Sequence, residues 1–461
     1  MSINASLIKS LVAATWSKVS IALYRLLQVP LLITTLGVEN YGIWLVLYSL
    51  PSWLTLANLG FGSVAANEMS IAMAAGNVDQ AKKVYSSTFA VLSSLLFLGG
   101  LASLLLIPLS SRSSFFSNGA LLIDREKAYT IAWLSIAVFV SFFGELSWGR
   151  FRAANKTHFA ILITSFEPWA ELICMYITLK LSTSLSSLAF SVLCSNVIYV
   201  LIKHWLSFSV LPVLSFSLQD IDRSKFKNLL KNGIAFQAFP LGNALLLQGS
   251  ILIIQMVLGP VAVALFATAR TLVRTVNQSM DIINQSIWPQ VSILFGLNNS
   301  QKLIKLHRKA VISTFIIALI GTLFLIFFGK FIYEKWLGAS LHLPQQLLMI
   351  FLCSIPLNGI WQASSVIHMA CNKHEGTAKR FLLCTIASAI ACYLFSLYMG
   401  IEGAALSTIL VDVLMIPYVL NRSLSIIGDN WYNFRKSIFN DLRLIPTLIS
   451  RSLITSVKAR I

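Results

Sequence analysis

Leu36-Gly37, close to the N-terminus, recurs as Leu258-Gly259, so the two dipeptides lie 222 residues apart (259 − 37 = 222). A second match, at a spacing of 217 residues (372 − 155 = 217), sets Ala153-Ala154-Asn155-Lys156 against Ala370-Cys371-Asn372-Lys373. The chain therefore contains one structural unit twice. Both copies are mostly apolar, which predicts a membrane protein built from two related halves.

The composition predicts an all-α polytopic membrane protein. Hydrophobic residues make up 57% of the chain and charged residues 11%, whereas a soluble domain carries about 25% charged residues. The apolar runs are continuous rather than alternating, which argues against membrane-spanning strands. At about 20 apolar residues for each crossing, we expect twelve transmembrane helices. Their expected limits are 11–35, 41–63, 86–109, 129–149, 158–179, 185–202, 234–257, 262–290, 310–329, 346–368, 381–399 and 402–420.

The twelve spans divide evenly between the two halves. Because each half holds six, both halves enter the membrane from the same side, which makes them parallel repeats in two six-helix bundles. The linker and the tail combine aromatic and basic residues, as amphipathic surface helices do. The expected units are an N-terminal bundle (1–214), a cytoplasmic linker helix (215–232), a C-terminal bundle (233–429) and a basic amphipathic cytoplasmic tail (430–461).

Positive charges predict the orientation in the membrane. When the N-terminus is placed in the cytoplasm, most of the 35 Lys and Arg residues fall in cytoplasmic loops and termini, as the positive-inside rule requires. We therefore expect both termini in the cytoplasm. The net charge of +18 is spread over these loops, where anionic head groups attract it, so membrane lipids rather than nucleic acid are the expected partners.

The sequence lacks the common signatures of catalysis and metal binding. The six cysteines form no CxxC pair, which gives no support to a metal or redox site, and we expect no cofactor. No GxxxxGK[ST], HExxH or GxSxG motif occurs, so the chain is not expected to be an enzyme or an ATP-driven pump. Transport would draw on an ion gradient or on the gradient of the substrate itself.

Span eight carries the sharpest set of polar residues. They recur at three- and four-residue steps, which places them on one helix face. Because charged groups at membrane depth are costly, this stripe predicts the lining of a water-filled cavity. A static network in which Arg274 pairs with Asp281 is the alternative. The stripe comprises Arg270, Arg274, Asn277, Asp281, Asn284, Gln285 and Trp288.

Span one carries a smaller cationic face, formed by Lys18 and Arg25. Lys18 lies near enough to the expected cytoplasmic end to reach the interface, whereas Arg25 lies deeper and predicts either a cavity or a structural pair. The 222-residue spacing sets Arg270 and Arg274 against uncharged positions, so the symmetry of the fold does not require these cations. Guanidinium groups bind phosphate through paired hydrogen bonds, which favours an anionic ligand over a cationic drug.

Four acidic residues are candidates for ion coupling. Each lies within an apolar span, where it either binds H⁺ or Na⁺ or forms half of a buried ion pair. The four are Glu145, Glu167, Glu171 and Asp412.

Leu36-Gly37-Val38-Glu39-Asn40-Tyr41-Gly42-Ile43-Trp44 resembles the LG-x-x-x-YG-x-W stretch of Wzx-type polysaccharide flippases. These flippases are members of the multidrug/oligosaccharidyl-lipid/polysaccharide exporter superfamily. The resemblance continues through Leu59-Gly60-Phe61-Gly62-Ser63, Asn67-Glu68 and Gly76-Asn77. It implies a MATE-like fold, with two six-helix bundles and a basic cytoplasmic link between them.

The resemblance also implies a substrate, an undecaprenyl-pyrophosphate-linked oligosaccharide such as the O-antigen repeat unit of lipopolysaccharide. Such flippases act in the bacterial inner membrane by alternating access and hold the head group in a cationic cavity, for which Arg25, Arg270 and Arg274 are the matching residues. Other polysaccharide-assembly proteins would be partners. Two alternatives remain open. A multidrug exporter of this fold predicts an acidic cavity, and a membrane glycosyltransferase or polymerase predicts a large external loop.

Overall fold

The computed structural model describes residues 3–58, 61–110, 124–222 and 237–437, which are almost entirely helical. The N-terminal half contains α1 (Ile3–Leu36), α2 (Val38–Ser52), η1 (Trp53–Asn58), α3 (Phe61–Ala74), α4 (Val78–Ser110), α5 (Arg125–Ala153), α6 (Thr157–Ser165), α7 (Glu167–Leu181), α8 (Leu185–Val210) and η2 (Leu218–Asp220). The C-terminal half contains α10 (Ala238–Ala244), η3 (Leu245–Gly249), α11 (Ser250–Leu258), α12 (Pro260–Gly296), α13 (Ser300–Leu337), η4 (Gly338–Ser340), α14 (Gln345–Ala370) and α15 (Glu375–Ile427). The prediction of an all-α polytopic membrane protein is confirmed.

Nine helices in the described ranges are long and apolar enough to cross a membrane. One of them, α15, is a hairpin rather than one rod, because Gly400 leaves the helical region (φ 62°, ψ −140°) and the chain reverses there. A hydrogen bond from Ser388 Oγ to Ser407 O (2.6 Å) joins its two arms. α12, which carries the polar stripe, is not among the nine. The exact count of twelve spans stays a prediction.

The backbone repeats its turns at the spacings found in the sequence. Gly37 and Gly259 both precede a helix with a left-handed φ, of 80° and 84°. Asn155 and Asn372 also share a left-handed φ, of 57° and 54°, where one helix ends and the next begins. Asparagine and glycine tolerate this conformation better than other residues. The matched motifs are therefore the turns of two equivalent units.

The hydrophobic core joins the two halves at one end only. We call this end, which contains Gly37 and Gly259, the glycine end. The largest core cluster lies there and draws residues from both halves, for example Trp44 and Phe266. The other clusters each belong to a single half. The halves therefore share a core at the glycine end and are packed separately elsewhere.

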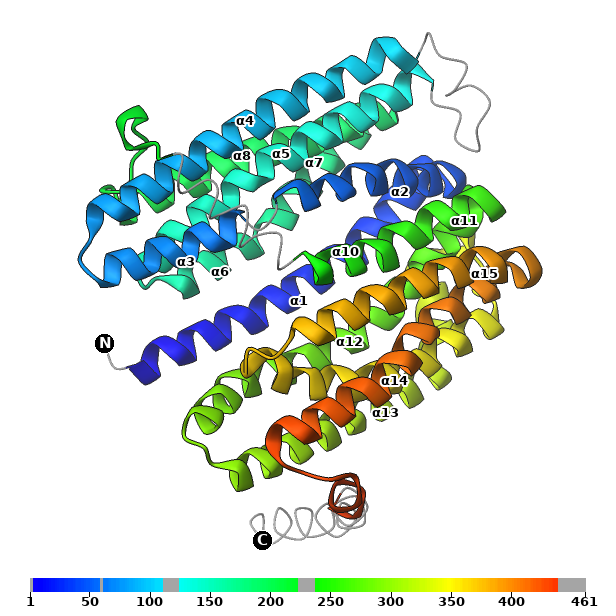
Figure 1. The fold of residues 1–461 in the computed structure, drawn as a ribbon. Helices are drawn as coiled ribbons and strands as arrows, with labels where there is room; N and C mark the ends of the chain where they lie inside the picture. The colour runs from blue at the N-terminus through cyan, green and yellow to red at the C-terminus, as the bar shows by residue number, and fades with distance from the viewer. Residues whose placement is uncertain (1–2, 59–60, 111–123, 223–236, 438–461) are drawn as a thin grey trace, which may run out of the picture.

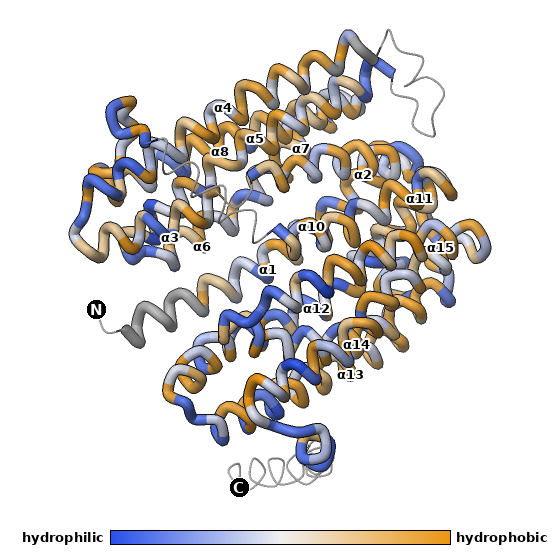
Figure 2. Tube along the Cα trace, in the orientation of Figure 1, coloured by the Kyte–Doolittle hydropathy of each residue, from blue (hydrophilic) through white to orange (hydrophobic). Residues whose placement is uncertain are grey.

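The opposite end, which we call the basic end, holds the short turns near residues 76, 155, 298 and 372 and the described start of α1. Figure 2 shows hydrophilic residues gathered at these turns, and a further hydrophilic stretch within α12 between apolar neighbours. In Figure 1 the two bundles converge where α2 meets α11 and diverge toward the basic end.

Glycine allows the closest contact between the halves. Gly42 of α2 lies against the backbone of Pro260 at the start of α12, and a Cβ at position 42 would overlap the Pro260 carbonyl oxygen. This close approach allows α2 and α12, which are equivalent helices of the two halves, to pack against each other.

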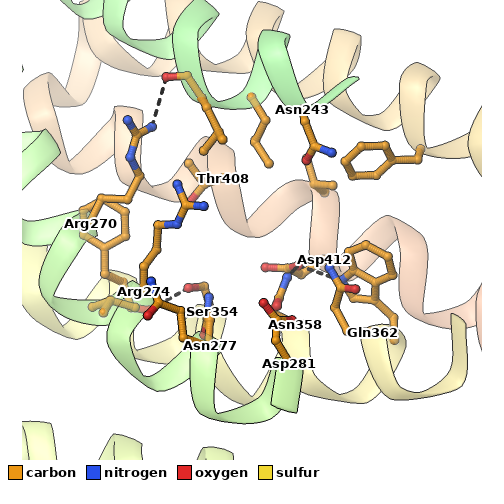
Figure 3. A pocket seen from close by; sticks show the side chains of 18 residues that line it. Asn243, Arg270, Arg274, Asn277, Asp281, Ser354, Asn358, Gln362, Thr408 and Asp412 are labelled. Carbon is orange, nitrogen blue, oxygen red and sulfur yellow. Dashed lines mark hydrogen bonds between the residues drawn. The ribbon is translucent and has the colours of Figure 1, made fainter. Parts of the chain in front are cut away.

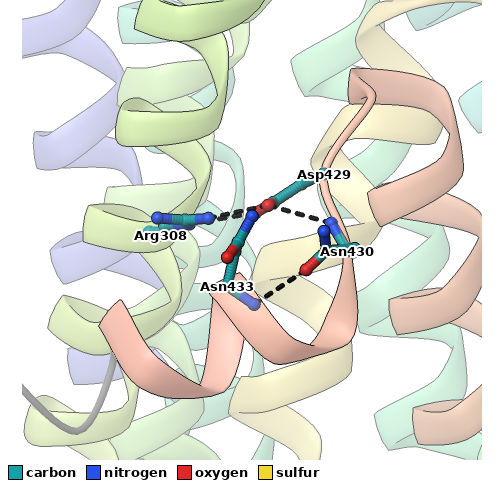
Figure 4. A network of polar contacts seen from close by, with 4 residues as sticks. All are labelled: Arg308, Asp429, Asn430 and Asn433. Atoms are coloured by element: carbon teal, nitrogen blue, oxygen red, sulfur yellow. Dashed lines mark hydrogen bonds and ion pairs between the residues drawn. The ribbon is translucent and has the colours of Figure 1, made fainter.

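The segment that follows each bundle folds back onto an equivalent helix. After the C-terminal bundle, the Asp429 carboxylate accepts two hydrogen bonds from Arg308 of α13 (2.9 and 2.7 Å), as Figure 4 shows. Phe434 is buried, and its ring lies 5.7 Å from that of His307. After the N-terminal bundle, Ser217 N donates to Ser86 Oγ of α4 (3.1 Å). Most of the expected linker helix, and the tail beyond 437, lie outside the described residues.

Candidate functional site

The polar stripe of α12 lines a cavity of about 210 Å³ inside the C-terminal half, which we call the C-half cavity. Its walls come from α10, η3, α12, α14 and both arms of α15. The polar residues that line it are Asn243, Arg270, Arg274, Asn277, Gln278, Asp281, Ser354, Asn358, Trp361, Gln362, Thr408 and Asp412.

The two arginines occupy one side of the C-half cavity (Figure 3). Arg270 is anchored, because its Nη1 donates to Leu247 O (3.3 Å) and Ser250 Oγ (3.1 Å). Leu247 lies in the π-helical turn η3, and such turns displace carbonyl groups from the regular helical ladder. Within the described ranges, Arg274 has no hydrogen-bond or ion-pair partner, so its guanidinium is available to a ligand.

Acidic and amide groups occupy the other side of the C-half cavity. Asp412 Oδ1 accepts hydrogen bonds from Asn358 Nδ2 (2.9 Å) and Trp361 Nε1 (2.8 Å). Asp281 lies on the α12 face and interacts electrostatically with Arg274, but no ion pair of 4.0 Å or less joins them. The static Arg274–Asp281 pair considered from the sequence is therefore not formed in this structure.

The first four residues of the stripe line the C-half cavity, and the rest do not. Asn284 is buried, while Gln285 and Trp288 are exposed and lie beyond the cavity wall. The helical period placed all seven on one face, but the neighbouring helices of the bundle cover only its first part. The expectation of a continuous polar face through Trp288 is thus limited to residues 270–281.

Arg25 and Lys18 lie beside the C-half cavity rather than in its wall. The charge of Arg25 acts on Arg270 and Arg274, and that of Lys18 acts on Asp281. Both residues project from α1, which packs on α6 and α7 of its own half and also contacts α12. The structure therefore brings cations from both halves to one region.

A second cavity of about 230 Å³ lies at the equivalent place in the N-terminal half, and we call it the N-half cavity. Glu167 and Glu171 of α7 line it, together with residues of α2, η1, α5 and α8. Glu171 Oε1 accepts a hydrogen bond from Tyr24 of α1 (2.9 Å). Of the two carboxylates, Glu171 thus contacts α1 directly.

The two remaining acidic candidates, Asp412 and Glu145, lie in different places. Asp412 belongs to the C-half cavity, as described above. Glu145 of α5 lines neither cavity and instead interacts electrostatically with Lys203, which is buried in α8. The four acidic residues named from the sequence therefore form no single site.

Sequence reasoning missed the polar wall contributed by α14. Asn358 and Gln362 are four residues apart in a mostly apolar span and follow Pro356 by two and six residues. This spacing would have placed them on one face. Trp361 offered no such signal, because an indole in an apolar span usually packs in the core.

The chain is similar in sequence to two curated membrane proteins. No protein-family model matches the chain. The chain is 22% identical over 353 residues to the "Putative O-antigen export protein" of Yersinia pseudotuberculosis, and the match covers 74% of this chain and 78% of that protein. It is 22% identical over 432 residues to the "Uncharacterized membrane protein EpsK" of Bacillus subtilis, with 90% and 82% covered.

Solved structures of the same fold include transporters in two conformations. An inward-facing multidrug resistance MATE family transporter of the MOP superfamily superposes with a TM-score of 0.67 at 15% identity, over 92% of this chain and 96% of that one. An outward-facing counterpart gives 0.62 at 16% identity, over 91% and 96%. A MOP superfamily transporter from Pyrococcus furiosus gives 0.60 at 16% identity, over 92% and 96%. The MATE-like fold is confirmed, and the similarity to a protein named for O-antigen export agrees with the resemblance to polysaccharide flippases drawn from the sequence.

Proposed function

We propose that this chain is a flippase that moves an undecaprenyl-pyrophosphate-linked oligosaccharide, such as an O-antigen-type repeat unit, from the cytoplasmic to the periplasmic leaflet of the bacterial inner membrane. The observation that carries the proposal is the pair Arg270 and Arg274 in a polar cavity within an apolar bundle. No carboxylate in the described ranges lies within ion-pair distance of either guanidinium.

Uncompensated guanidinium groups at membrane depth call for an anionic ligand. Removing two such charges from water costs free energy unless an opposite charge or good hydrogen bonds replace the solvent. A diphosphate offers several acceptor oxygens and suits the bidentate geometry of arginine. The lipid tail would remain in the bilayer while the head group crosses through the cavity.

The distribution of the core supports alternating access. The halves share a core only at the glycine end, so a rocking motion about that end would open and close the space between the bundles. With the basic end placed in the cytoplasm, as the positive-inside rule expects, the structure corresponds to the cytoplasm-facing state. Both termini would then be cytoplasmic.

Ion coupling is assigned to the N-half cavity. Glu167 and Glu171 share one cavity, with no cation within ion-pair distance among the described residues. Two carboxylates in a low-dielectric site need a proton or Na⁺ to offset their charge. Glu171 contacts α1 through Tyr24, so binding there would act on the helix that also carries Arg25. Asp412 and Glu145 are the remaining coupling candidates.

The acidic N-half cavity also supports a second candidate, a cation-coupled multidrug exporter of the same fold. An organic cation would fit Glu167 and Glu171 better than the arginines. The two functions differ in which cavity holds the cargo. The flippase needs the arginines for binding, whereas the drug exporter does not.

Deletion of the gene in the parent cell tests the proposal. We expect loss of surface polysaccharide together with accumulation of repeat units on the undecaprenyl carrier. Wild-type protein should restore both, whereas Arg270→Ala/Arg274→Ala at equal expression should not. Lys330→Ala/Lys335→Ala is the matched control, because it also removes two positive charges but lies outside both cavities. Normal surface polymer with raised sensitivity to cationic dyes would instead support the drug exporter.

A further inference from the structure

The side of the C-half cavity opposite the arginines is organised around a fixed carboxylate. Asp412 is 6% exposed, and two donors from α14, Asn358 Nδ2 and Trp361 Nε1, converge on its Oδ1 at 2.9 and 2.8 Å. Trp361 is in turn held against Phe381, with ring centroids 5.9 Å apart. The carboxylate is thus oriented by neutral groups and not by a cation.

Amides surround this carboxylate. Asn358 and Gln362 of α14 line this side of the cavity, whereas Asn277 of α12 lies nearer the arginines, between Arg274 and Asp281 along the helix. The Oδ1 atom of Asn277 is buried and lacks a hydrogen-bond partner within the described ranges. Buried polar atoms usually have a partner, so Asn277 is free to accept a hydrogen bond from a ligand that spans the two sides of the cavity.

We propose that this side, formed by Asp412, Asn358, Gln362 and Asp281, is a subsite for an uncharged sugar joined directly to the diphosphate. This inference rests on the proposed function, which places the diphosphate at Arg270 and Arg274. Sugar hydroxyls both donate and accept hydrogen bonds, which matches a wall of amides and carboxylates. Small-molecule sites characteristically combine such convergent polar groups with an aromatic wall.

The spacing of the two sides agrees with such a ligand. Arg274 and Asp281 are seven residues apart on α12, which corresponds to about 10 Å along the helix axis at 1.5 Å per residue. The diphosphate and the first ring would therefore lie side by side along α12, with the ring against α14. The lining residues come from one bundle, so the subsite forms without the other half.

The negative charge of this side also predicts that the subsite distinguishes acidic sugars from neutral ones. A uronic acid at the first position would place a carboxylate beside Asp281 and Asp412, and like charges in a poorly screened cavity repel each other. A neutral N-acetylated sugar meets no such repulsion. The subsite therefore selects against acidic sugars at the position next to the diphosphate.

Binding of three defined lipids to the full-length protein in nanodiscs tests the inference. The lipids are bare undecaprenyl pyrophosphate, the same lipid with one N-acetylhexosamine, and the same lipid with one hexuronic acid. We expect the neutral sugar to bind about tenfold more tightly than the bare lipid, which is about 1.4 kcal/mol, and the acidic sugar to bind more weakly than the neutral one. Asp412→Asn should weaken the discrimination against the acidic sugar, because it removes one of the two carboxylates that repel it.

A control variant and a second test variant show whether an effect is specific to the proposed subsite. Asp79→Asn removes an exposed carboxylate at the basic end and should leave the order of the three lipids unchanged. Gln362→Leu, which keeps the hydrogen bonds of Asp412, should lower the advantage of the neutral sugar several-fold and serves if Asp412→Asn fails to fold.

Two results would overturn the sugar subsite. One is that the ratios of the three affinities are unchanged in both Asp412→Asn and Gln362→Leu, while the bare lipid still binds through the arginines. The other is an effect of Asp412→Asn that appears only when Na⁺ is present, which would make this wall a cation site. Failure of the bare lipid to bind at all would instead overturn the proposed function.

Discussion

The C-half and N-half cavities occupy equivalent places in the two repeats but present opposite charges. At a spacing of 222 residues, Arg270 and Arg274 of the C-half cavity correspond to Tyr48 and Ser52 of the N-half cavity. The carboxylates Glu167 and Glu171 line the N-half cavity instead. The shared backbone thus determines where a cavity forms, and the side chains of each half determine what it binds.

Under the proposed function, the division of charge gives the two halves separate tasks. An anion held by the arginines and a cation held by the glutamates would otherwise compete for one site. Between them lies α1, which presents Tyr24 to Glu171 and Arg25 to the arginines of the other half. A single helix therefore interacts with the charged groups of both cavities, and under the proposed function it would couple them.

Moving one cation between equivalent positions should have the largest effect. In the variant Arg274→Ser/Ser52→Arg the net charge is unchanged, but the guanidinium is transferred to the acidic cavity. We expect transport in the deletion strain to fall on the order of 100-fold, because loss of a charge that binds an anion costs about 2–5 kcal/mol. Accumulated lipid-linked repeat units measure the defect. Transport near the wild-type level would show that either cavity can hold the anion.

Removing one charge from the N-half cavity should slow transport without weakening substrate binding. Glu171→Gln keeps an acceptor for Tyr24 but cannot bind H⁺ or Na⁺. We expect turnover to fall about tenfold, an effect of about 1.4 kcal/mol on the limiting step, and to lose its response to an imposed ion gradient. Measurements in proteoliposomes with equal loading test this.

Glu39→Gln is the control for this variant, because Glu39 is exposed in the first turn of α2. The assignment of coupling to the N-half cavity fails if Glu171→Gln weakens binding of the lipid-linked substrate and leaves the response to the gradient intact.

Separating the halves at the glycine end should shift the balance of conformations rather than substrate binding. Gly42→Ala places a methyl group against the Pro260 carbonyl oxygen, and such overpacking typically costs about 1–3 kcal/mol. We expect the state closed at the glycine end to lose about tenfold in population. Spin-label distances between cysteines introduced at exposed positions 39 and 261 would report the change. Gly296→Ala, where a Cβ meets open space, should leave the distances unchanged.

Much of the fold follows from the sequence, because apolar length and repeated turn motifs act locally. The matched dipeptides at Gly37 and Gly259 and the Asn155 and Asn372 turns are conformational requirements that a single sequence displays twice. The arginines of α12 were equally visible, since a cation in an apolar helix needs an explanation.

The contact partners of the site residues could not be predicted from the sequence. Tyr24 and Glu171 are separated by 147 residues, and Asn358 and Asp412 by 54. Pairings of this kind depend on how helices pack, which no local pattern encodes. The π-helical turn that presents Leu247 to Arg270 is likewise a consequence of packing rather than of a distinctive sequence.

A last comparison, which affects stability rather than transport, concerns how each bundle holds the segment that follows it. Arg308 of α13 and Ser86 of α4 are equivalent positions at the 222-residue spacing, but the first binds the Asp429 carboxylate and the second accepts a hydrogen bond from the Ser217 backbone. Asp429→Asn should lower stability by about 1.5–3 kcal/mol, as expected for loss of a charge-assisted hydrogen bond, and Ser86→Ala by about 0.5–1.5 kcal/mol. Thermal unfolding of the purified protein measures both. If Asp429→Asn and Ser86→Ala destabilise the protein equally, burial of the segment, including Phe434, outweighs the ion pair. Charge would then distinguish the cavities of the two halves but not the attachment of the segments that follow them.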